Sequence, residues 1–512
     1  MKFFANAPLC LVCGWLAAWT GLAAPAPVDP ATGSADSFFG NTNLYTFHLT
    51  IAADQWAIME QTDQFKPNAV RGPGGNNEPG GFRPGQRQGG GGMMGIEFKK
   101  GTAALEFQGQ SCGAIRVRFK GNSSYNFARN ALKRSLKLDF NDLEKGRTFF
   151  GLTKLNLNNN AMDPSQLREA LAYDIFRAGG VPAGRTAFAR VFITVPGQYN
   201  KAYAGLYTVV EQVDERFLKS RFGTKAGMLL KPERLPGLPY FGDDWAAYTN
   251  RVQAKTAVGT NDSRRFIEFA KFLNRADDAQ FRASVGDYAE VDEFLRFVAL
   301  QGLLANMDSP LMTGHNYYLY LHPTTRKLLW LPWDLNEAFG GFNRAGSGSE
   351  QASLSLDHPF TAVNRFAERL LQTPGVKDRY HDIVRGLLAT NFNSARLFPL
   401  IDAMAATIRP ALAADKMVSL PQFETALSAL SQAETAVEDN GGRRDFRPGG
   451  GGPGGPRRSR TPLKAFINQR VESAQQQLAG KLDGYTPRDV RPGQNGGGGG
   501  FRPGGPPMGP PQ

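Results

Sequence analysis

The sequence Asn306-Met-Asp308-Ser-Pro-Leu-Met-Thr-Gly-His-Asn316-Tyr-Tyr-Leu-Tyr320 is followed at a short interval by Trp330-Leu-Pro-Trp-Asp334-Leu-Asn336. The apolar run before it, at 291–305, is typical of a core helix, and 317–322 with 328–332 predict a strand hairpin. Asp308 therefore lies just past a buried helix, and Asp334 lies at the end of a buried strand. This arrangement predicts a polar site at the edge of a helical core.

The residue types at these positions suit phosphoryl transfer from ATP. A carboxylate at the mouth of a buried helix can accept a proton from a hydroxyl group, which is the role expected of Asp308. Mg²⁺ (or Mn²⁺) prefers oxygen ligands and commonly takes one or two protein carboxylates together with phosphate oxygens, which Asn316 and Asp334 could supply. The alternative is purely structural, with Asp308 as a helix-end cap and Asp334 in a polar turn.

Outward from this stretch, the two halves of the chain differ in periodicity. The first half alternates between apolar and polar residues, which predicts strands at 44–51, 96–99, 103–107, 114–120, 135–140, 155–158, 189–195 and 205–211. Besides a short segment at 52–61, its one prominent predicted helix is 164–178. The second half has helical spacing at 263–274, 291–305, 362–371, 377–390, 394–413, 421–438 and 461–482. The sequence thus predicts an α+β fold, with a β-rich N-terminal lobe (44–235) and a helical C-terminal lobe (236–485) around a cleft.

Gly and Pro are concentrated in three segments of the chain, which has 59 Gly and 33 Pro. We expect disorder in a Gly-rich insertion at 71–95, a Gly/Arg/Pro-rich insertion at 439–460 and a tail at 486–512. Much of the net charge of +13 lies in the arginines of these segments. A basic tail could hold an anionic envelope polymer, although a solvated linker is the simpler interpretation.

The N-terminus has the pattern of a signal peptide, expected to span residues 1–26. Lys2 precedes an apolar run, and small residues follow it. Residues 27–43 are expected to form an unstructured leader. After cleavage only Cys112 would remain, which excludes an internal disulfide or a zinc–cysteine cluster. No later segment is apolar enough to span a membrane, so we expect an exported protein (periplasmic, cell-surface or extracellular) with no nucleic acid partner.

Several separated motifs resemble those of one known family. They are Val117-Arg-Phe-Lys-Gly121-Asn-Ser-Ser124, Lys133-Arg-Ser-Leu-Lys137-Leu-Asp-Phe, Asp163-Pro-Ser-Gln-Leu-Arg168, Gly205-Leu-Tyr-Thr-Val-Val-Glu211, His315-Asn316-Tyr-Tyr-Leu-Tyr and Pro332-Trp-Asp334. In this order they resemble the CotH kinase family of secreted, spore-coat-type kinases, which are distant relatives of protein kinases. The resemblance covers roughly residues 44–480. It implies a two-lobed protein-kinase-like fold, and transfer of the γ-phosphate of ATP to Ser or Thr of an exported or envelope protein.

By that resemblance, Asp308 is the catalytic base, and Asn316 and Asp334 are the metal ligands. The separation between Asp308 and Asn316 is longer than that between the corresponding residues of protein kinases. Asn306 and Asn336 are therefore kept as alternative ligands.

The resemblance also implies residues that hold the phosphates of ATP. Small residues after a strand allow backbone N–H groups and hydroxyls to approach phosphate, and those expected here are Asn122, Ser123 and Ser124. An ordinary hairpin turn is the alternative for this segment. Lys137, on its alternating strand, is expected to contact the α- and β-phosphates. The alternatives to it are Lys133, Arg134 and Lys231.

The helix at 164–178 takes the place of the kinase helix that orients this lysine. Arg168 fits the family pattern and is expected to lie at the cofactor. Glu169 is the alternative partner for the lysine, against the simpler reading of a solvated glutamate. Glu211 and Val213 end an apolar strand and resemble a kinase hinge, where backbone groups hold adenine.

Two other functions fit the sequence. A kinase-like site could instead transfer AMP, as a nucleotidyl transferase. A catalytically silent surface or matrix protein, attached through its Gly/Arg/Pro tails, belongs to a different class. It would have no need of Asp308, Asn316 and Asp334 together.

Overall fold

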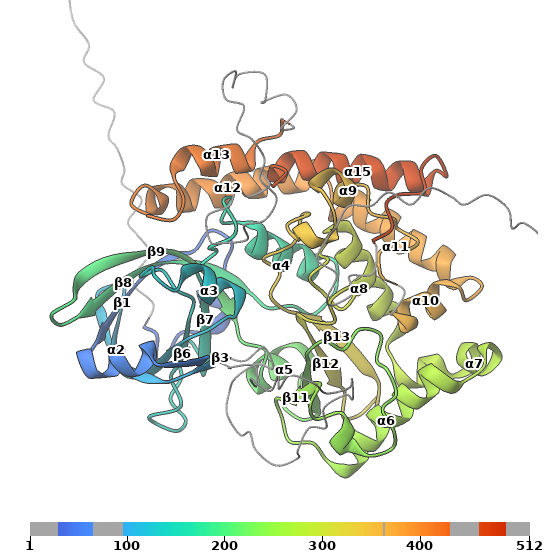
Figure 1. Ribbon diagram of the computed structural model, residues 1–512, viewed down its shortest axis with the longest axis horizontal. Helices are drawn as coiled ribbons and strands as arrows, with labels where there is room; N and C mark the ends of the chain where they lie inside the picture. The colour runs from blue at the N-terminus through green and yellow to red at the C-terminus, as the bar shows by residue number, and fades with distance from the viewer. Residues whose placement is uncertain (1–28, 65–95, 362–363, 431–459, 488–512) are drawn as a thin grey trace, which may run out of the picture.

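A computed structural model describes residues 29–64, 96–361, 364–430 and 460–487 of the chain (Figure 1). The predicted signal peptide, the Gly-rich insertion, almost all of the Gly/Arg/Pro-rich insertion and of the tail, and the end of the helix predicted at 421–438 lie outside these residues. Within them the fold is mixed α+β, with a β-rich N-terminal region and a mostly helical C-terminal region.

Seven strands of the N-terminal region close into a barrel, in the order β1–β4–β5–β6–β7–β9–β8. Their bounds are β1 Leu44–Ile51, β4 Gly101–Phe107, β5 Gln110–Phe119, β6 Leu136–Asp139, β7 Lys154–Asn158, β8 Thr186–Val195 and β9 Tyr199–Glu211. Neighbours pair antiparallel except β1 with β8, a parallel pair that closes the barrel. The predicted strands are confirmed, whereas closure was not predicted, because it depends on pairing between segments far apart in the sequence.

The barrel interior follows from the alternation along each strand. On β6, Leu136 and Leu138 are buried in the barrel core, and Lys137 faces outward between them. The same alternation on β5 buries Val117 and Phe119 and turns Arg118 out. Polar residues on the outer wall of β5, β6 and β7 are therefore available to a site outside the barrel.

A second sheet of four strands, in the order β11–β10–β12–β13, forms the base of the helical region. The predicted hairpin is confirmed as β12 (Tyr317–Leu321) and β13 (Leu328–Pro332), with Tyr317 opposite Pro332. β10 (Met228–Pro232) pairs with β12, although the sequence placed it in the N-terminal lobe. β11 (Val252–Ala254) was not predicted, since three residues are too few for a periodic pattern. A further short pair, β2 (Thr62–Gln64) with β3 (Ile96–Phe98), lies outside both sheets.

Most of the C-terminal region is helical. Its longer helices are α5 Glu215–Phe222, α6 Thr260–Arg275, α7 Asp278–Tyr288, α8 Val291–Leu303, α10 Arg365–Leu371, α11 Val376–Thr390, α12 Ser394–Leu412, α13 Leu420–Leu427 and α15 Leu463–Leu478. The helix α8 is the buried one that ends before Asp308. In Figure 1, α12, α13 and α15 run along the top, and α12 also contacts β9 of the barrel. Across the described residues, no helix has the length and apolarity needed to span a bilayer.

The helix α4 (Arg168–Ala178) lies between the barrel and the helical region, and contacts β8, β9 and α8. It is buried over most of its surface, including its first two residues, Arg168 and Glu169. It begins later than the predicted 164–178, because residues 164–167 form a turn. Since α4 touches both parts of the molecule, residues in its first turn can face the space between them.

The segment before β1 is part of the fold, and the prediction of an unstructured leader over 27–43 is wrong for residues 29–43. Ser34 caps a short helix, α1 (Ala35–Phe38). Phe38 is fully buried in the barrel core, with ring centroids 4.8 Å from Tyr45 and 5.0 Å from Phe150.

We predict that Phe38→Ala destabilises the protein by about 3–5 kcal/mol, because it removes a fully buried ring and leaves a cavity. The measurement is the free energy of unfolding from urea titration. Leu143→Ala is the control, since Leu143 is 42% exposed, and is expected to change stability by less than about 0.5 kcal/mol. Equal, small effects for both variants would contradict the assignment of this segment to the core.

Candidate functional site

Asp308, Asn316 and Asp334 meet at the open end of the β12–β13 hairpin. The carbonyl of Asn316 accepts the N–H of Trp333 at 3.0 Å, which places Asn316 beside Asp334. The Asn316 amide nitrogen donates to the backbone oxygen of Asp308 at 2.8 Å and to its Oδ2 at 3.0 Å. The hairpin register therefore brings together the three residues that were predicted to act together.

The backbone at two of these positions is unusual. Asn316 has φ 60° and Asp334 has φ 55°, both in the left-handed region. Asn and Asp tolerate this conformation better than other residues with a Cβ, and such positions cluster at functional sites. The N–H of Asp334 donates to the hydroxyl of Tyr173 at 3.1 Å, which ties the end of the hairpin to α4.

Asp308 has the proton affinity of a base suited to near-neutral pH. Burial raises the pKa of its carboxyl to about 6; a hydrogen bond with Thr313 lowers the pKa, the charge of Asp334 raises it, and a hydrogen bond with Asn316 lowers it. The opposing effects show that Asp334 lies within electrostatic reach of Asp308.

A lysine that was not singled out, Lys120, faces Asp334. It directly follows β5, and its Nζ donates to Oδ1 of Asn158 at 2.5 Å and lies 5.6 Å from the ring centroid of Trp333. Burial lowers the pKa of Lys120, while the charges of Asp334 and Glu169 raise it. Lys120 is thus a half-buried cation within electrostatic reach of two carboxyl groups. In the sequence, the signal for Lys120 was its place directly before Gly121 in the motif Val117-Arg-Phe-Lys-Gly121-Asn-Ser-Ser124.

Glu169 is the second carboxylate, and the reading of it as a solvated residue is wrong. Its side chain is 2% exposed, and both of its oxygens accept from Nδ2 of Asn158 at 2.8 and 2.9 Å. Burial, together with the charge of Asp334, raises the pKa of Glu169 to about 8. Asn158 therefore links Lys120 to the first turn of α4.

Lys137 lies on the same outer wall of the barrel, one strand away. It pairs in register with Arg118, and its Nζ donates to Oε1 of Gln212 at 2.6 Å. Burial and the charges of Arg118 and Lys120 hold the pKa of Lys137 well below its usual range. The residues that repel one another in this way form a cationic row, defined as Arg118, Lys120, Lys137, Lys154, Lys231 and Lys255.

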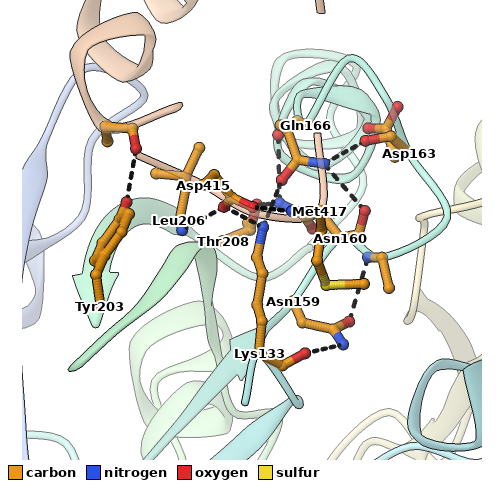
Figure 2. Close-up of polar contacts among 12 residues, drawn as sticks. Lys133, Asn159, Asn160, Asp163, Gln166, Tyr203, Leu206, Thr208, Asp415 and Met417 are labelled. Carbon is orange, nitrogen blue, oxygen red and sulfur yellow. Dashed lines mark hydrogen bonds and ion pairs between the residues drawn. The ribbon is translucent and has the colours of Figure 1, made fainter. Parts of the chain in front are cut away.

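The alternatives Lys133 and Arg134 are held elsewhere. Nζ of Lys133 lies 2.6 Å from Oδ2 of Asp415 in a buried ion pair (Figure 2). Arg134 makes a two-pronged contact with the carboxylate of Glu60, at 2.7 and 2.6 Å. Lys231, in contrast, belongs to the cationic row.

Arg168 is held by other buried groups, and its expected contact with the cofactor stays a prediction. Its Nε lies 3.3 Å from the carboxylate of Asp163. Its guanidinium also donates to the backbone oxygens of Phe339 and Thr461, each at 2.8 Å. These partners fix the start of α4 against the helical region. A structural role explains the position of Arg168 in the motif.

The segment Asn122, Ser123 and Ser124 begins a short helix, α3 (Ser123–Ala128), so the alternative of a hairpin turn is wrong. Gly121 precedes it with φ 84°, and a Cβ there would lie 2.2 Å from Oγ of Ser124. The tight turn requires glycine and places these residues directly after Lys120. Their contact with phosphate stays a prediction.

The predicted hinge residues are partly committed to other contacts. Glu211 accepts from Nε of Arg185 at 2.9 Å and from Arg221 at 3.0 Å, and its N–H donates to the Arg185 carbonyl at 3.0 Å. The carbonyl of Val213 accepts from Nε2 of Gln212 at 2.9 Å. Because Gln212 also contacts Lys137, the segment lies beside the cationic row, and contact of its backbone with adenine stays a prediction.

The donor set suits a metal ion that is completed by phosphate oxygens. In the part of the chain that the structure describes, no three His, Cys, Asp or Glu residues gather as a metal cluster. Asp334 offers a carboxylate and Asn316 an amide beside it, which is the small protein contribution usual for Mg²⁺. Of the alternatives, Asn306 is fully buried and donates to Gln301 at 2.8 Å, whereas Asn336 is partly exposed.

Two known sequences show the relationship of this chain. Inner spore coat protein H of Bacillus subtilis (strain 168) is 24% identical over 299 residues, which is 58% of this chain and 77% of that protein. Spore coat protein homolog 1 of Rhizopus delemar is 26% identical over 306 residues, covering 56% of this chain and 48% of that protein. The chain thus spans about half the length of the fungal relative.

A solved structure, the proinflammatory kinase CtkA of Helicobacter pylori, aligns with 72% of this chain and 94% of its own, at 9% identity and a TM-score of 0.25. That score is below the level that indicates a shared fold. The model of the CotH family, described as CotH kinase protein, matches residues 117–438, which include Lys120, Glu169 and all three residues at the hairpin end. The match covers more than half of the sequence, and the chain belongs to the CotH kinase family.

Proposed function

We propose that this chain is an exported protein kinase that transfers the γ-phosphate of ATP to a Ser or Thr hydroxyl. The observation that carries the proposal is the meeting of two groups of residues. Lys120 is held by Asn158, which also contacts Glu169, and it lies within electrostatic reach of Asp334, which lies beside Asn316 and Asp308. Lys120 supplies positive charge for the phosphates. Asp334 and Asn316 supply oxygen ligands for a metal ion, and Asp308 supplies the base.

In this proposal the barrel and the helical region act as the two lobes of a kinase-like fold. The nucleotide lies along the outer wall of the barrel, with its triphosphate on the cationic row. Arg118 and Lys137 are paired across β5 and β6, and Lys120 is the next outward residue, directly after β5. Diagonal neighbours on a sheet are about 7–8 Å apart, so Lys120 and Lys137 can bind different phosphates of one chain.

Asp334 and Asn316 are the proposed ligands of Mg²⁺ or Mn²⁺, which when bound neutralises charge on the phosphate oxygens. Asp308 orients the acceptor hydroxyl and takes its proton. With a pKa of about 6 the Asp308 carboxylate is ionised at neutral pH, yet it retains affinity for a proton. Asn316 fixes its orientation through the hydrogen bond to Oδ2.

The acceptor is proposed to be an exported or envelope protein. The two relatives bear the names of spore coat proteins, which supports a place at a surface. The predicted signal peptide agrees with export. The acceptor would therefore meet this kinase during or after secretion.

We predict that the purified protein transfers label from γ-labelled ATP, with Mg²⁺ or Mn²⁺, to a generic acceptor protein. Asp308→Ala is expected to lower the rate by about 10²–10⁴-fold, because the base is lost. Asp334→Ala is expected to lower it by about 10³-fold, because charge stabilisation at the phosphates is lost. The measurement is label incorporated per folded molecule. Transfer of α-label instead would indicate nucleotidyl transfer, and neither transfer nor ATP binding by the wild type would exclude both enzymes.

We predict different kinetic effects at the two lysines. Lys120→Met is expected to lower kcat by about 10–100-fold, because a charge-assisted contact to phosphate and the partner of Glu169 are both lost. Lys137→Met is expected to raise the KM for ATP with little change in kcat, since Lys137 lies farther from Asp334. Lys100→Met is the control, because Lys100 lies outside the cationic row, is exposed and pairs with Asp142 at 2.9 Å. The reverse pattern would assign the transferred phosphate to Lys137.

We predict that kcat rises with pH through about 6, as Asp308 loses its proton. Thr313→Val removes the hydroxyl group that lowers the pKa of Asp308, so the acid limb should move to higher pH. The variant is expected to lose about threefold more rate at pH 6 than at pH 8. Thr313→Ser keeps the hydroxyl and should follow the wild type. An equal loss at both pH values would argue against Asp308 as the titrating base.

A further inference from the structure

We propose that Asp415, through its ion pair with Lys133, is a positioning residue for the nucleotide-binding half of the site. The inference rests on the proposed kinase function. The two residues are 282 positions apart in the sequence, and their charged atoms lie 2.6 Å apart (Figure 2). Their side chains are 2% and 0% exposed. Asp415 comes just after α12, so the pair joins the C-terminal helices to the barrel.

The Lys133–Asp415 ion pair packs tightly against β9. Oδ2 of Asp415 also accepts the N–H of Leu206 at 2.9 Å, and Oδ1 accepts that of Met417 at 2.9 Å. At Gly205, where φ is 137°, a Cβ would lie 2.6 Å from Cδ of Lys133 and 2.7 Å from Oδ2 of Asp415. The backbone of β9 thus approaches the pair at a residue that has no side chain, and the position of both charges is fixed.

Lys133, whose position is fixed by Asp415, also contacts the loop that precedes α4. Its Nζ also donates to Oε1 of Gln166 at 3.2 Å. Gln166 is buried with φ 56°, and its Nε2 donates to the carbonyls of Asn160, at 3.1 Å, and of Asp163. Figure 2 shows Gln166 between the ion pair and these two residues. The charge of Lys133 therefore holds the middle of the loop.

The same loop connects two residues of the proposed nucleotide site. Asn158 ends β7 before the loop, and Glu169 lies in the first turn of α4 after it. The N-cap residue, Leu167, makes no side-chain cap. Instead, Oδ2 of Asp163 in the loop accepts the N–H of Arg168 at 2.9 Å, so the first turn of α4 is held by the loop as well as by the helical region. Displacement of Gln166 would move Glu169 relative to Asn158 and Lys120.

A positioning role and a purely stabilising role predict different results. Loss of a buried ion pair lowers stability in either case, because one charge is left unpaired. Only a positioning role changes the affinity for nucleotide in molecules that are still folded. The readout that separates them is the KM for ATP, compared with the KM for the acceptor protein.

The experiment compares wild type, Asp415→Asn and Asp402→Asn in γ-phosphate transfer and in direct ATP binding, well below the unfolding temperature of each. Asp415→Asn is expected to raise the KM for ATP about tenfold or more, since small misplacements of positioning groups are costly. The KM for the acceptor should change by less than about twofold. Asp402→Asn is the control. Asp402 is an exposed residue of α12 that forms an ion pair with Lys464 of α15, and this variant should match the wild type.

If Asp415 positions Glu169, the rise in the KM for ATP caused by Asp415→Asn depends on the Glu169 side chain. In a Glu169→Gln background, Asp415→Asn should therefore add less than about a twofold change, as expected for coupled residues. If Asp415→Asn does not fold, the double variant Lys133→Met with Asp415→Leu removes both charges without leaving one unpaired, and the same rise in the KM for ATP is expected.

An unchanged KM for ATP, with only a lower unfolding temperature, would overturn the positioning role and leave the kinase proposal standing. Additive effects of Asp415→Asn and Glu169→Gln would overturn it as well. A wild type that neither binds ATP nor transfers phosphate would overturn both proposals. The wild-type measurement thus shows whether the kinase proposal fails or only the positioning role of Asp415.

Discussion

The electrostatic attraction of Lys120 for the carboxyl groups of Asp334 and Glu169 is the interaction on which the arrangement of the molecule depends. Burial and the charge of Asp334 raise the pKa of Glu169 to about 8, and the charge of Lys120 opposes that shift. Burying such a carboxyl group without a cation nearby is costly. Lys120 follows β5, its partner Asn158 ends β7, Glu169 begins α4, and Asp334 follows β13. Four elements from distant parts of the sequence therefore have to meet at one place, and the barrel is held against the helical region.

The cationic row adds a second constraint of the opposite kind. Like charges on neighbouring positions of a sheet are destabilising, and Arg118, Lys120 and Lys137 occupy such positions on the outer wall of β5 and β6. Burial and mutual repulsion lower the pKa of Lys137 and of its neighbours. A bound anion would relieve this repulsion, which supports the proposal of a polyphosphate ligand there.

Much of the local structure could be predicted from the sequence, because the alternation on β6 and the apolar runs of β12 and α8 are local signals. Asp308, Asn316 and Asp334 could be found because they lie at the ends of such elements. Closure of the barrel by β1 and β8 could not be predicted from the sequence, because no local pattern indicates a distant strand partner. The choice between Arg168 and Glu169 depends on how α4 is rotated. Because α4 is buried on most sides, no solvated face in the sequence indicates that rotation. Likewise, alternation shows that Lys120 and Lys137 face outward, but not which of them meets α4.

Asp334 connects the two halves of the site electrostatically. Its charge raises the pKa of Lys120, which favours the ammonium form, and it also raises the pKa of Asp308, which keeps that carboxylate basic. A residue with both effects has to be held at a fixed distance from each partner. The left-handed backbone at Asp334, the hydrogen bond from its N–H to Tyr173 and the hairpin register supply that rigidity. The strained conformation at this position thus has a chemical reason, because relaxing it would change the electrostatic effect of Asp334 on both Lys120 and Asp308.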